Sequence, residues 1–99
     1  MPTLICRRVT FYSDQDEAAF FEWLKRISCI KEFRGEGYEL YLHIARKKIS
    51  DANLRELLAI FERYKIDMKQ LALFLNDRNS AWFKGNTHAF WHRKVFGKG

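Results

Sequence analysis

Two histidines near the end of the chain have a spacing that can bind zinc. His88 and His92 are four residues apart, and on a helix they would share one face, as two zinc ligands do. The residues between them are Ala-Phe-Trp, so the glutamate base of the zinc-protease motif is missing. No carboxylate follows, and Arg93 and Lys94 would repel a cation. The sequence therefore predicts no metal site, and it favours structural or partner-contacting histidines.

Cys6 and Cys29 are the candidates for thiol chemistry. A nucleophilic thiol needs a base and an electropositive environment, and Cys6 beside Arg7, with His43 on a neighbouring predicted strand, is the one pairing available. No local motif supports it, so we expect buried thiols in a reducing compartment. The alternative, a disulfide, would need an oxidising compartment that nothing in the sequence signals. Phosphate-cradling and serine-hydrolase motifs are also missing, so we expect neither an enzyme nor a cofactor.

The clearest functional signal is the charge of the last 22 residues, because every acidic residue lies at or before Asp77. Residues 78–99 carry five of the formal net charge of +6, and they also hold two Trp and three Phe. A positive, aromatic surface is suited to a negative partner. We therefore predict that partner contacts come from this segment. The predicted contact residues are Trp82, Lys84, His88, Trp91, His92, Arg93 and Lys94.

Two classes of partner fit such a surface. An acidic protein would be held by Trp and Arg anchors, whereas nucleic acid would place phosphates on the bases and unpaired bases on the rings. The sequence contains no recognised nucleic-acid motif, including the strand pattern of a ferredoxin-like RNA-binding domain. We therefore favour a protein partner, with a nucleic-acid-binding module as the alternative.

Length and composition indicate one folded domain over residues 1–99. The chain is 47% hydrophobic and 30% charged, which is ordinary for a globular protein, and its 16% aromatic content would fill a small core with large rings. The longest apolar runs, 57–61 and 71–75, are far too short to cross a membrane. Residues 1–8 do not resemble a signal peptide. We expect a cytoplasmic protein that does not bind membranes.

Local patterns predict a strand and a helix in the first third of the chain. Apolar residues alternate over 3–12 and predict a strand whose apolar side begins at Ile5. Arg7 falls on the same side, so we expect an edge strand. Ser13 is a predicted N-cap, and an apolar stripe of helical period predicts a helix over 14–28.

The middle of the chain predicts a β-hairpin followed by a second helix. Residues 29–34 and 38–45 flank Gly35-Glu36-Gly37, and two glycines in a short link are typical of a hairpin turn. Ser50 is the predicted N-cap of a helix with its own apolar stripe over 54–61.

The last third is less regular. Asp67 followed by Gln70 is a capping-box pattern and predicts a third helix. Residues 88–96 alternate as a strand would, yet Thr87 could instead cap a short helix. The predicted fold class is α+β, with the order β-α-β-β-α-α and a C-terminal strand as one alternative. That order is related to the split βαβ, or ferredoxin-like, layout.

In size and element order the whole chain resembles the small cytoplasmic immunity proteins of bacterial toxin systems. This resemblance implies a domain that binds and neutralises one toxin domain. Immunity proteins that face basic nucleases are usually acidic, whereas this chain is basic. The implied toxin surface is therefore acidic, or the contact is not mainly electrostatic. The resemblance assigns no site residues in this sequence.

Overall fold

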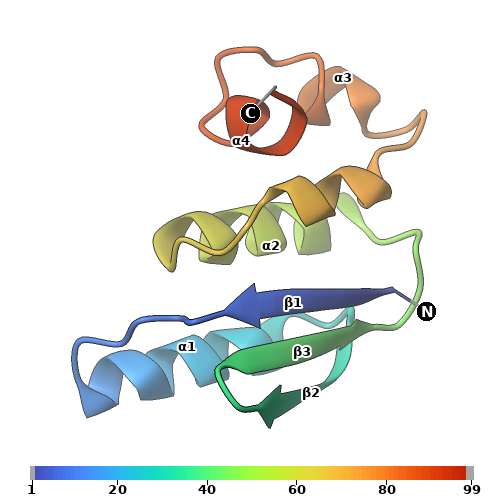
Figure 1. Cartoon of the computed structure of the whole chain (residues 1–99). Coiled ribbons are helices and arrows are strands. Elements are labelled where there is room, and N and C mark those ends of the chain that lie inside the picture. The colour runs from blue at the N-terminus through green and yellow to red at the C-terminus, as the bar shows by residue number, and fades with distance from the viewer. Residues whose placement is uncertain (1, 98–99) are drawn as a thin grey trace.

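The computed structural model describes residues 2–97 and shows an α+β fold, as the sequence predicts. A sheet of three strands is followed by helices that stack beside it (Figure 1). The elements are β1 (Thr3–Arg7), α1 (Asp14–Arg26), β2 (Ile30–Glu36), β3 (Glu39–Ile44), α2 (Asp51–Arg63), the 3-10 helix η1 (Lys69–Phe74), α3 (Ser80–Phe83) and α4 (His92–Phe96).

The sheet has the strand order β1-β3-β2, and both pairs are antiparallel. β1 and β2 are therefore parallel to each other with β3 between them, which is the split βαβ arrangement that the element order predicts. Leu4 lies opposite Leu42, and Phe33 lies opposite Leu42 on the other side. These side chains share the inner face of the sheet.

The prediction of which side of β1 faces the core is wrong. Leu4 and Cys6 are buried, whereas Ile5 is only partly buried and Arg7 is exposed. The prediction extended the alternation to residue 12, but Arg8 has a positive φ of 51° and the strand ends before it. Phe11 reaches the core from outside the strand, with its ring 5.3 Å from that of Phe20.

β1 is an edge strand, as predicted, and a side chain satisfies part of its free edge. The backbone N–H of Ile5 donates to Oε1 of Gln70 at 2.8 Å, and Nε2 of Gln70 donates to the carbonyl of Ile5 at 2.8 Å. η1, which carries Gln70, thus takes a place beside β1 where a fourth strand could pair. Residues 92–96 form the helix α4, so the strand alternative for 88–96 is wrong.

The first two predicted helices form with the predicted caps. The side chain of Ser13 accepts a hydrogen bond from Asp16 N at 3.1 Å, and Ser50 accepts one from Asn53 N at 3.1 Å. α1 ends at Arg26, two residues before the predicted end. The hairpin also forms, but its strands run further into the glycine link, and only Gly37, with φ of 60°, needs the left-handed conformation.

The predicted third helix is a 3-10 helix and begins after Asp67. Oδ1 of Asp67 accepts from Lys69 N at 3.0 Å, and Nε2 of Gln70 donates to the carbonyl of Asp67 at 2.9 Å. The reciprocal capping box is therefore only partly formed. Gln70 does not bond the Asp67 amide, and its side chain also holds β1.

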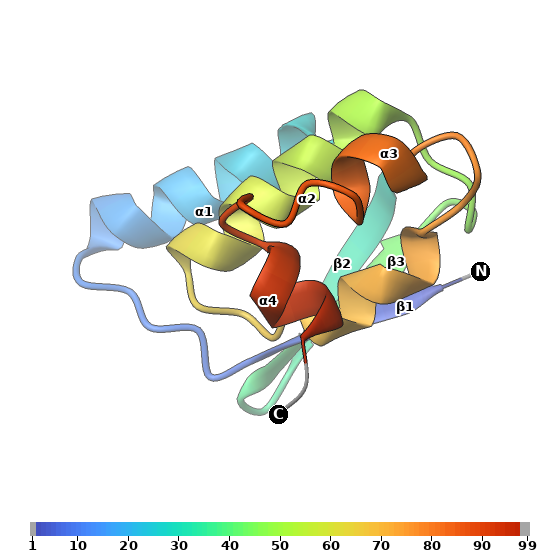
Figure 2. The same cartoon turned by 90° about the horizontal axis from the view of Figure 1, so that it is seen from above.

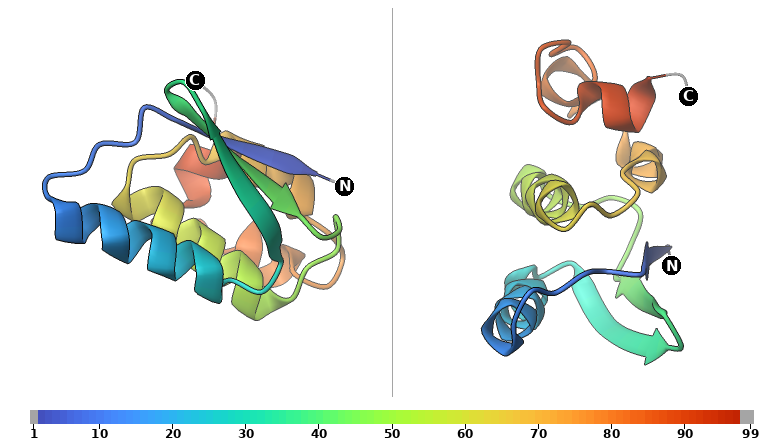
Figure 3. Two further views of the ribbon diagram at one scale, coloured as in Figure 1. Left: turned by 90° about the horizontal axis from the view of Figure 1, so that it is seen from below. Right: turned by 60° about the vertical axis from the view of Figure 1, so that its left-hand side comes forward.

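The fold has three tiers (Figures 1 and 3). The sheet and α1 form the first, α2 and η1 form the second, and α3 and α4 form an outer tier that covers the second. α1 buries two side chains, whereas α2 buries five because it is covered on two sides. Phe83, Trp91 and Val95 of the outer tier belong to the same core cluster as α2. Within residues 2–97, none of the helices has both the length and the apolar character that a membrane span requires.

Candidate functional site

A pair of asparagines fixes the start of the C-terminal segment. Asn79 is 2% exposed; its Nδ2 donates to the carbonyl of Phe74 at 2.8 Å and its Oδ1 accepts from Asn76 N at 2.9 Å. Oδ1 of Asn76 in turn accepts from Asn79 N at 3.0 Å. Because a buried amide is costly unless hydrogen-bonded, these bonds hold the turn between η1 and α3 in one geometry.

The aromatic residues that follow pack into one cluster, which we call the tail cluster: Trp82, Phe83, Phe90, Trp91 and Phe96. Their ring centroids are 5.8 Å apart for Trp82 and Trp91, 4.9 Å for Phe83 and Phe96, and 5.0 Å for Phe90 and Trp91. These near-perpendicular arrangements are the favourable edge-to-face geometry. Figure 2 shows the chain of this segment curling over α2 between α3 and α4.

Trp91 is a core residue and not the contact residue that the sequence predicted. Its side chain is 8% exposed, and its Nε1 donates to the carbonyl of Phe83 at 2.8 Å. A partner protein cannot reach a ring that is already packed and hydrogen-bonded within the fold. We therefore remove Trp91 from the predicted contact set.

Phe90 is the exposed ring of the tail cluster, and sequence reasoning missed it. It is 52% exposed and rests edge-on against the buried Trp91. The turns on either side are closed by backbone hydrogen bonds from Ala89 to Asn86 at 3.2 Å and from His92 to Ala89 at 3.1 Å. Since Phe90 and Trp91 are adjacent in sequence, composition could not distinguish which ring faces outward.

Trp82 is half-buried and lies under a basic side chain from α2. The guanidinium carbon of Arg55 is 4.0 Å from the ring centroid of Trp82, a cation–π contact. The indole Nε1 of Trp82 is buried, with no hydrogen-bond partner among the described residues. Arg55 could not be inferred from the sequence, because its contact with Trp82 links two segments far apart in the chain.

The basic residues in the predicted contact set differ in whether they form an ion pair. Lys84 and Arg93 are exposed, and neither forms an ion pair within residues 2–97. Nζ of Lys84 lies 5.7 Å from the ring centroid of Phe96. Lys94 forms an ion pair with Glu62, which joins α4 to α2. Lys98, a base that also contributes to the charge of the segment, lies outside the described residues.

His88 and His92 do not share a helix face, because α4 begins at His92 and His88 lies in the turn before it. His88 is exposed, and its backbone N–H donates to Oδ1 of Asn86 at 3.2 Å. The ring of His92 packs 5.7 Å from that of Phe96. In the described part of the chain, no group of three or more His, Cys, Asp or Glu could hold a metal ion.

The two cysteines are free, buried thiols. Cys6 lies on the inner face of β1, whereas His43 points to the outer face and bonds the hydroxyl of Thr3 at 3.2 Å, so the pairing of Cys6 with His43 does not form. Burial raises the pKa of Cys6 to about 12 and that of Cys29 to about 11. Since the thiolate is the reactive form, neither site is suited to nucleophilic chemistry.

These pKa values predict a specific pH dependence of stability. The folded state holds Cys6 protonated to higher pH than the unfolded state, whose thiol pKa is about 8.5. Its contribution is complete below that pH and is lost as pH rises toward 12, at up to about 1.4 kcal/mol per pH unit. Urea unfolding between pH 8 and 10.5 should therefore show a steeper loss for the wild type than for Cys6→Ala. Equal slopes would contradict the assigned burial.

Charge is distributed unevenly between the two halves of the fold. Residues 2–44, which form the sheet and α1, contain six bases and seven acids. Residues 45–97, which form the other two tiers, contain eleven bases and five acids. The excess comes from two places: the loop 46–48 supplies three bases and residues 78–97 supply four, whereas α2 itself holds two bases and three acids.

Comparison with protein-family models, with curated proteins and with solved structures found no match for this chain. The resemblance to immunity proteins therefore remains an expectation from size and element order. Three features of the described structure bear on function: the exposed ring of Phe90, the bases around the tail cluster and the net positive charge of residues 45–97.

Proposed function

We propose that this chain is a non-catalytic binding domain that holds an acidic partner protein against its outer tier. The observation that carries the proposal is the ring of Phe90, which is 52% exposed while resting on the buried Trp91 in the basic half of the fold. Aromatic residues are enriched in protein interfaces, and a few of them supply most of the binding energy.

The residues that support the ring of Phe90 make it a favourable anchor for a partner. Trp91 is fixed by its hydrogen bond to the carbonyl of Phe83, and turns close the backbone on either side of Phe90. A ring that is already positioned loses little conformational entropy when a partner covers it. Because less free energy is lost in ordering the ring, the affinity for the partner is higher.

Exposed bases surround the tail cluster and give the proposed contact its charge preference. Such bases increase the rate of encounter with an acidic surface and disfavour basic partners. Lys94 adds to this charge although it pairs with Glu62. The proposed contact set keeps Trp82, Lys84, His88, His92 and Arg93, replaces Trp91 by Phe90 and adds Arg55.

The resemblance to immunity proteins supports the kind of partner. The thiols are buried with raised pKa values, and among residues 2–97 the histidines belong to no group of three or more potential metal ligands. We propose that the partner is a protein which the domain neutralises, such as the acidic surface of a toxin domain, in the manner of an immunity protein.

The test is affinity capture with a pair of matched variants. Phe90→Ser removes the proposed anchor, whereas Tyr12→Ser removes a ring that is 86% exposed in the other half of the fold. Phe90→Ser should weaken capture of the partner about thirtyfold, which corresponds to about 2 kcal/mol, and Tyr12→Ser should capture like the wild type. Both should keep the wild-type melting temperature within a few degrees, as expected of surface substitutions. Equal capture by all three proteins would show that Phe90 is not the anchor.

A further inference from the structure

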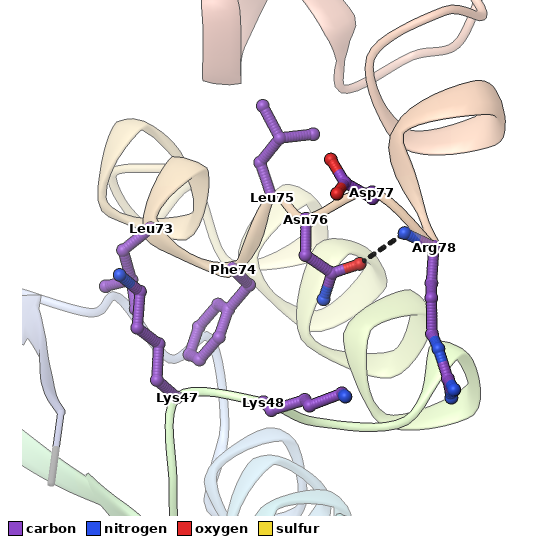
Figure 4. A pocket seen from close by; sticks show the side chains of 8 residues that line it. All are labelled: Lys47, Lys48, Leu73, Phe74, Leu75, Asn76, Asp77 and Arg78. Atoms are coloured by element: carbon purple, nitrogen blue, oxygen red, sulfur yellow. Dashed lines mark hydrogen bonds between the residues drawn. The ribbon is translucent and has the colours of Figure 1, made fainter.

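A basic pocket lies where the loop before α2 meets the segment that leaves η1. It has a volume of about 450 Å³ and is shown in Figure 4. Its lining residues are Lys47, Lys48, Leu73, Phe74, Leu75, Asn76, Asp77 and Arg78. It shares no residue with the contact set proposed above, and its volume is in the range of small-molecule sites.

Three cationic side chains border this pocket. Lys47, Lys48 and Arg78 are exposed, and none of them forms an ion pair within residues 2–97. The side chains of Lys48 and Arg78 converge on the lower rim in Figure 4. The carboxylate of Asp77 lies on the other side of the chain and points away from Lys48, so it does not neutralise that rim.

Asn76 adds a hydrogen-bond donor whose direction is fixed. Its Oδ1 accepts from the backbone N–H of Arg78 at 2.9 Å and from that of Asn79 at 3.0 Å. Because only the oxygen can accept these bonds, the orientation of the amide is determined. Nδ2 is then turned toward the hollow above Lys48, where Figure 4 shows it. The buried Asn79 holds this wall in place.

The remaining wall is apolar and comes from η1. Leu73 is partly buried, and Phe74 is buried beneath the pocket. A ligand that fits this combination carries a compact, strongly charged acceptor group and an apolar part. A phosphate monoester has a charge of about −1.5 to −2 near neutral pH and three acceptor oxygens, which match the cations and the amide better than a single carboxylate does.

We propose that this pocket binds a small phosphate monoester, with the phosphate held by Lys48, Arg78 and Asn76 and the apolar part resting on Leu73. Lys47, whose side chain extends toward Leu73 on the other side of the pocket in Figure 4, adds long-range attraction. Free phosphate and a phosphate attached to a ring share this chemistry, and the experiment below separates them.

The experiment is an NMR titration of 15N-labelled protein at low ionic strength with phenyl phosphate, inorganic phosphate and phenol. Phenyl phosphate should bind with a Kd of about 0.1–1 mM, typical for so few atoms, and shift the side-chain amide signals of Asn76 and the backbone signal of Arg78. Inorganic phosphate should bind about tenfold more weakly because it lacks the apolar contact. Phenol should cause no shift at the same concentrations.

Asn76→Asp is the most discriminating variant. A carboxylate keeps the acceptor for the backbone N–H groups of Arg78 and Asn79, but it replaces the donor that faces the pocket with a negative charge. Binding of phenyl phosphate should fall more than tenfold while the melting temperature is maintained. Arg78→Gln should also weaken binding about tenfold, and Lys31→Gln, which removes an exposed base on β2 outside both proposed sites, should not.

Three results would overturn the proposal. The first is unchanged binding in Asn76→Asp, and the second is no shift with 10 mM phenyl phosphate. The third is binding of a short single-stranded oligonucleotide through Asn76 and Arg78 without binding of phenyl phosphate, which would assign the pocket to a nucleic-acid chain. Loss of protein capture in Phe90→Ser would leave this test unaffected, because the two sites share no residue.

Discussion

A chain that ends at Asn79 should lose most of its stability and melt without a cooperative transition near that of the full chain. Truncation removes Phe83, Trp91 and Val95, which the core cluster contains, and it uncovers α2 and η1. The loss should be several kcal/mol of a total of roughly 5–10 kcal/mol for a domain of this size. Thermal melting followed by circular dichroism measures this, and binding of a hydrophobic dye should rise.

The same experiment distinguishes an integral tier from an appendage. If α3 and α4 were an independent arm, the truncated chain would unfold cooperatively at the temperature of the full chain and would bind no additional dye. We do not expect that result, because α2 is buried on two sides. Truncation would turn one of these buried faces into a large apolar surface in water.

Replacing Trp91 by Ala should lower the free energy of unfolding by about 3–5 kcal/mol, the usual cost of removing a large core ring. Trp91→Phe should cost less, because it keeps most of the packing and loses mainly the hydrogen bond to the carbonyl of Phe83, worth about 1 kcal/mol. Urea denaturation measures both values.

Phe90→Ala is the matched control for that prediction. It removes the neighbouring ring, which is half exposed, and should lower the free energy of unfolding by less than about 1 kcal/mol. Similar small effects for Trp91→Ala and Phe90→Ala would show that Trp91 lies at the surface, as the sequence suggested.

The parts of the fold that the sequence predicts well are those determined by neighbouring residues. α1 and α2 carry apolar stripes of helical period and begin after Ser13 and Ser50, whose hydroxyls cap the first turn. The hairpin follows from the glycines near residue 37. β1 is an edge strand as predicted, although the premise was wrong, because Arg7 lies on the exposed side of the strand. For the helices and the hairpin the signal and the structure lie within a few residues of each other.

The parts that the sequence did not predict depend on distant contacts. The side chain of Gln70 forms two hydrogen bonds with the backbone of Ile5, which is distant in sequence, and these bonds place η1 beside β1. The inner face of β1 could not be inferred, because the positive φ of Arg8 interrupts an alternation that looks continuous in the sequence. A pattern of period two does not show where its strand ends.

The sequence indicates the composition of the proposed contact surface but not its individual residues. Charge and ring content point to a basic, aromatic segment, yet packing decides that Trp91 is inside and Phe90 outside. Lys94 is partly compensated by Glu62, and Arg55 joins the surface from α2. Only the tertiary arrangement brings these groups together.

The most direct test of the central claim is the capture experiment repeated after complete nuclease digestion of the lysate. A protein partner should be retained in the same amount with and without nuclease, and the Phe90→Ser protein should lose it in both arms. The claim would be contradicted if digestion abolished capture and the purified protein bound a generic oligonucleotide at micromolar affinity in physiological salt. In that case log affinity would fall linearly with log salt with a slope of about −3, as displacement of counterions by several bases requires.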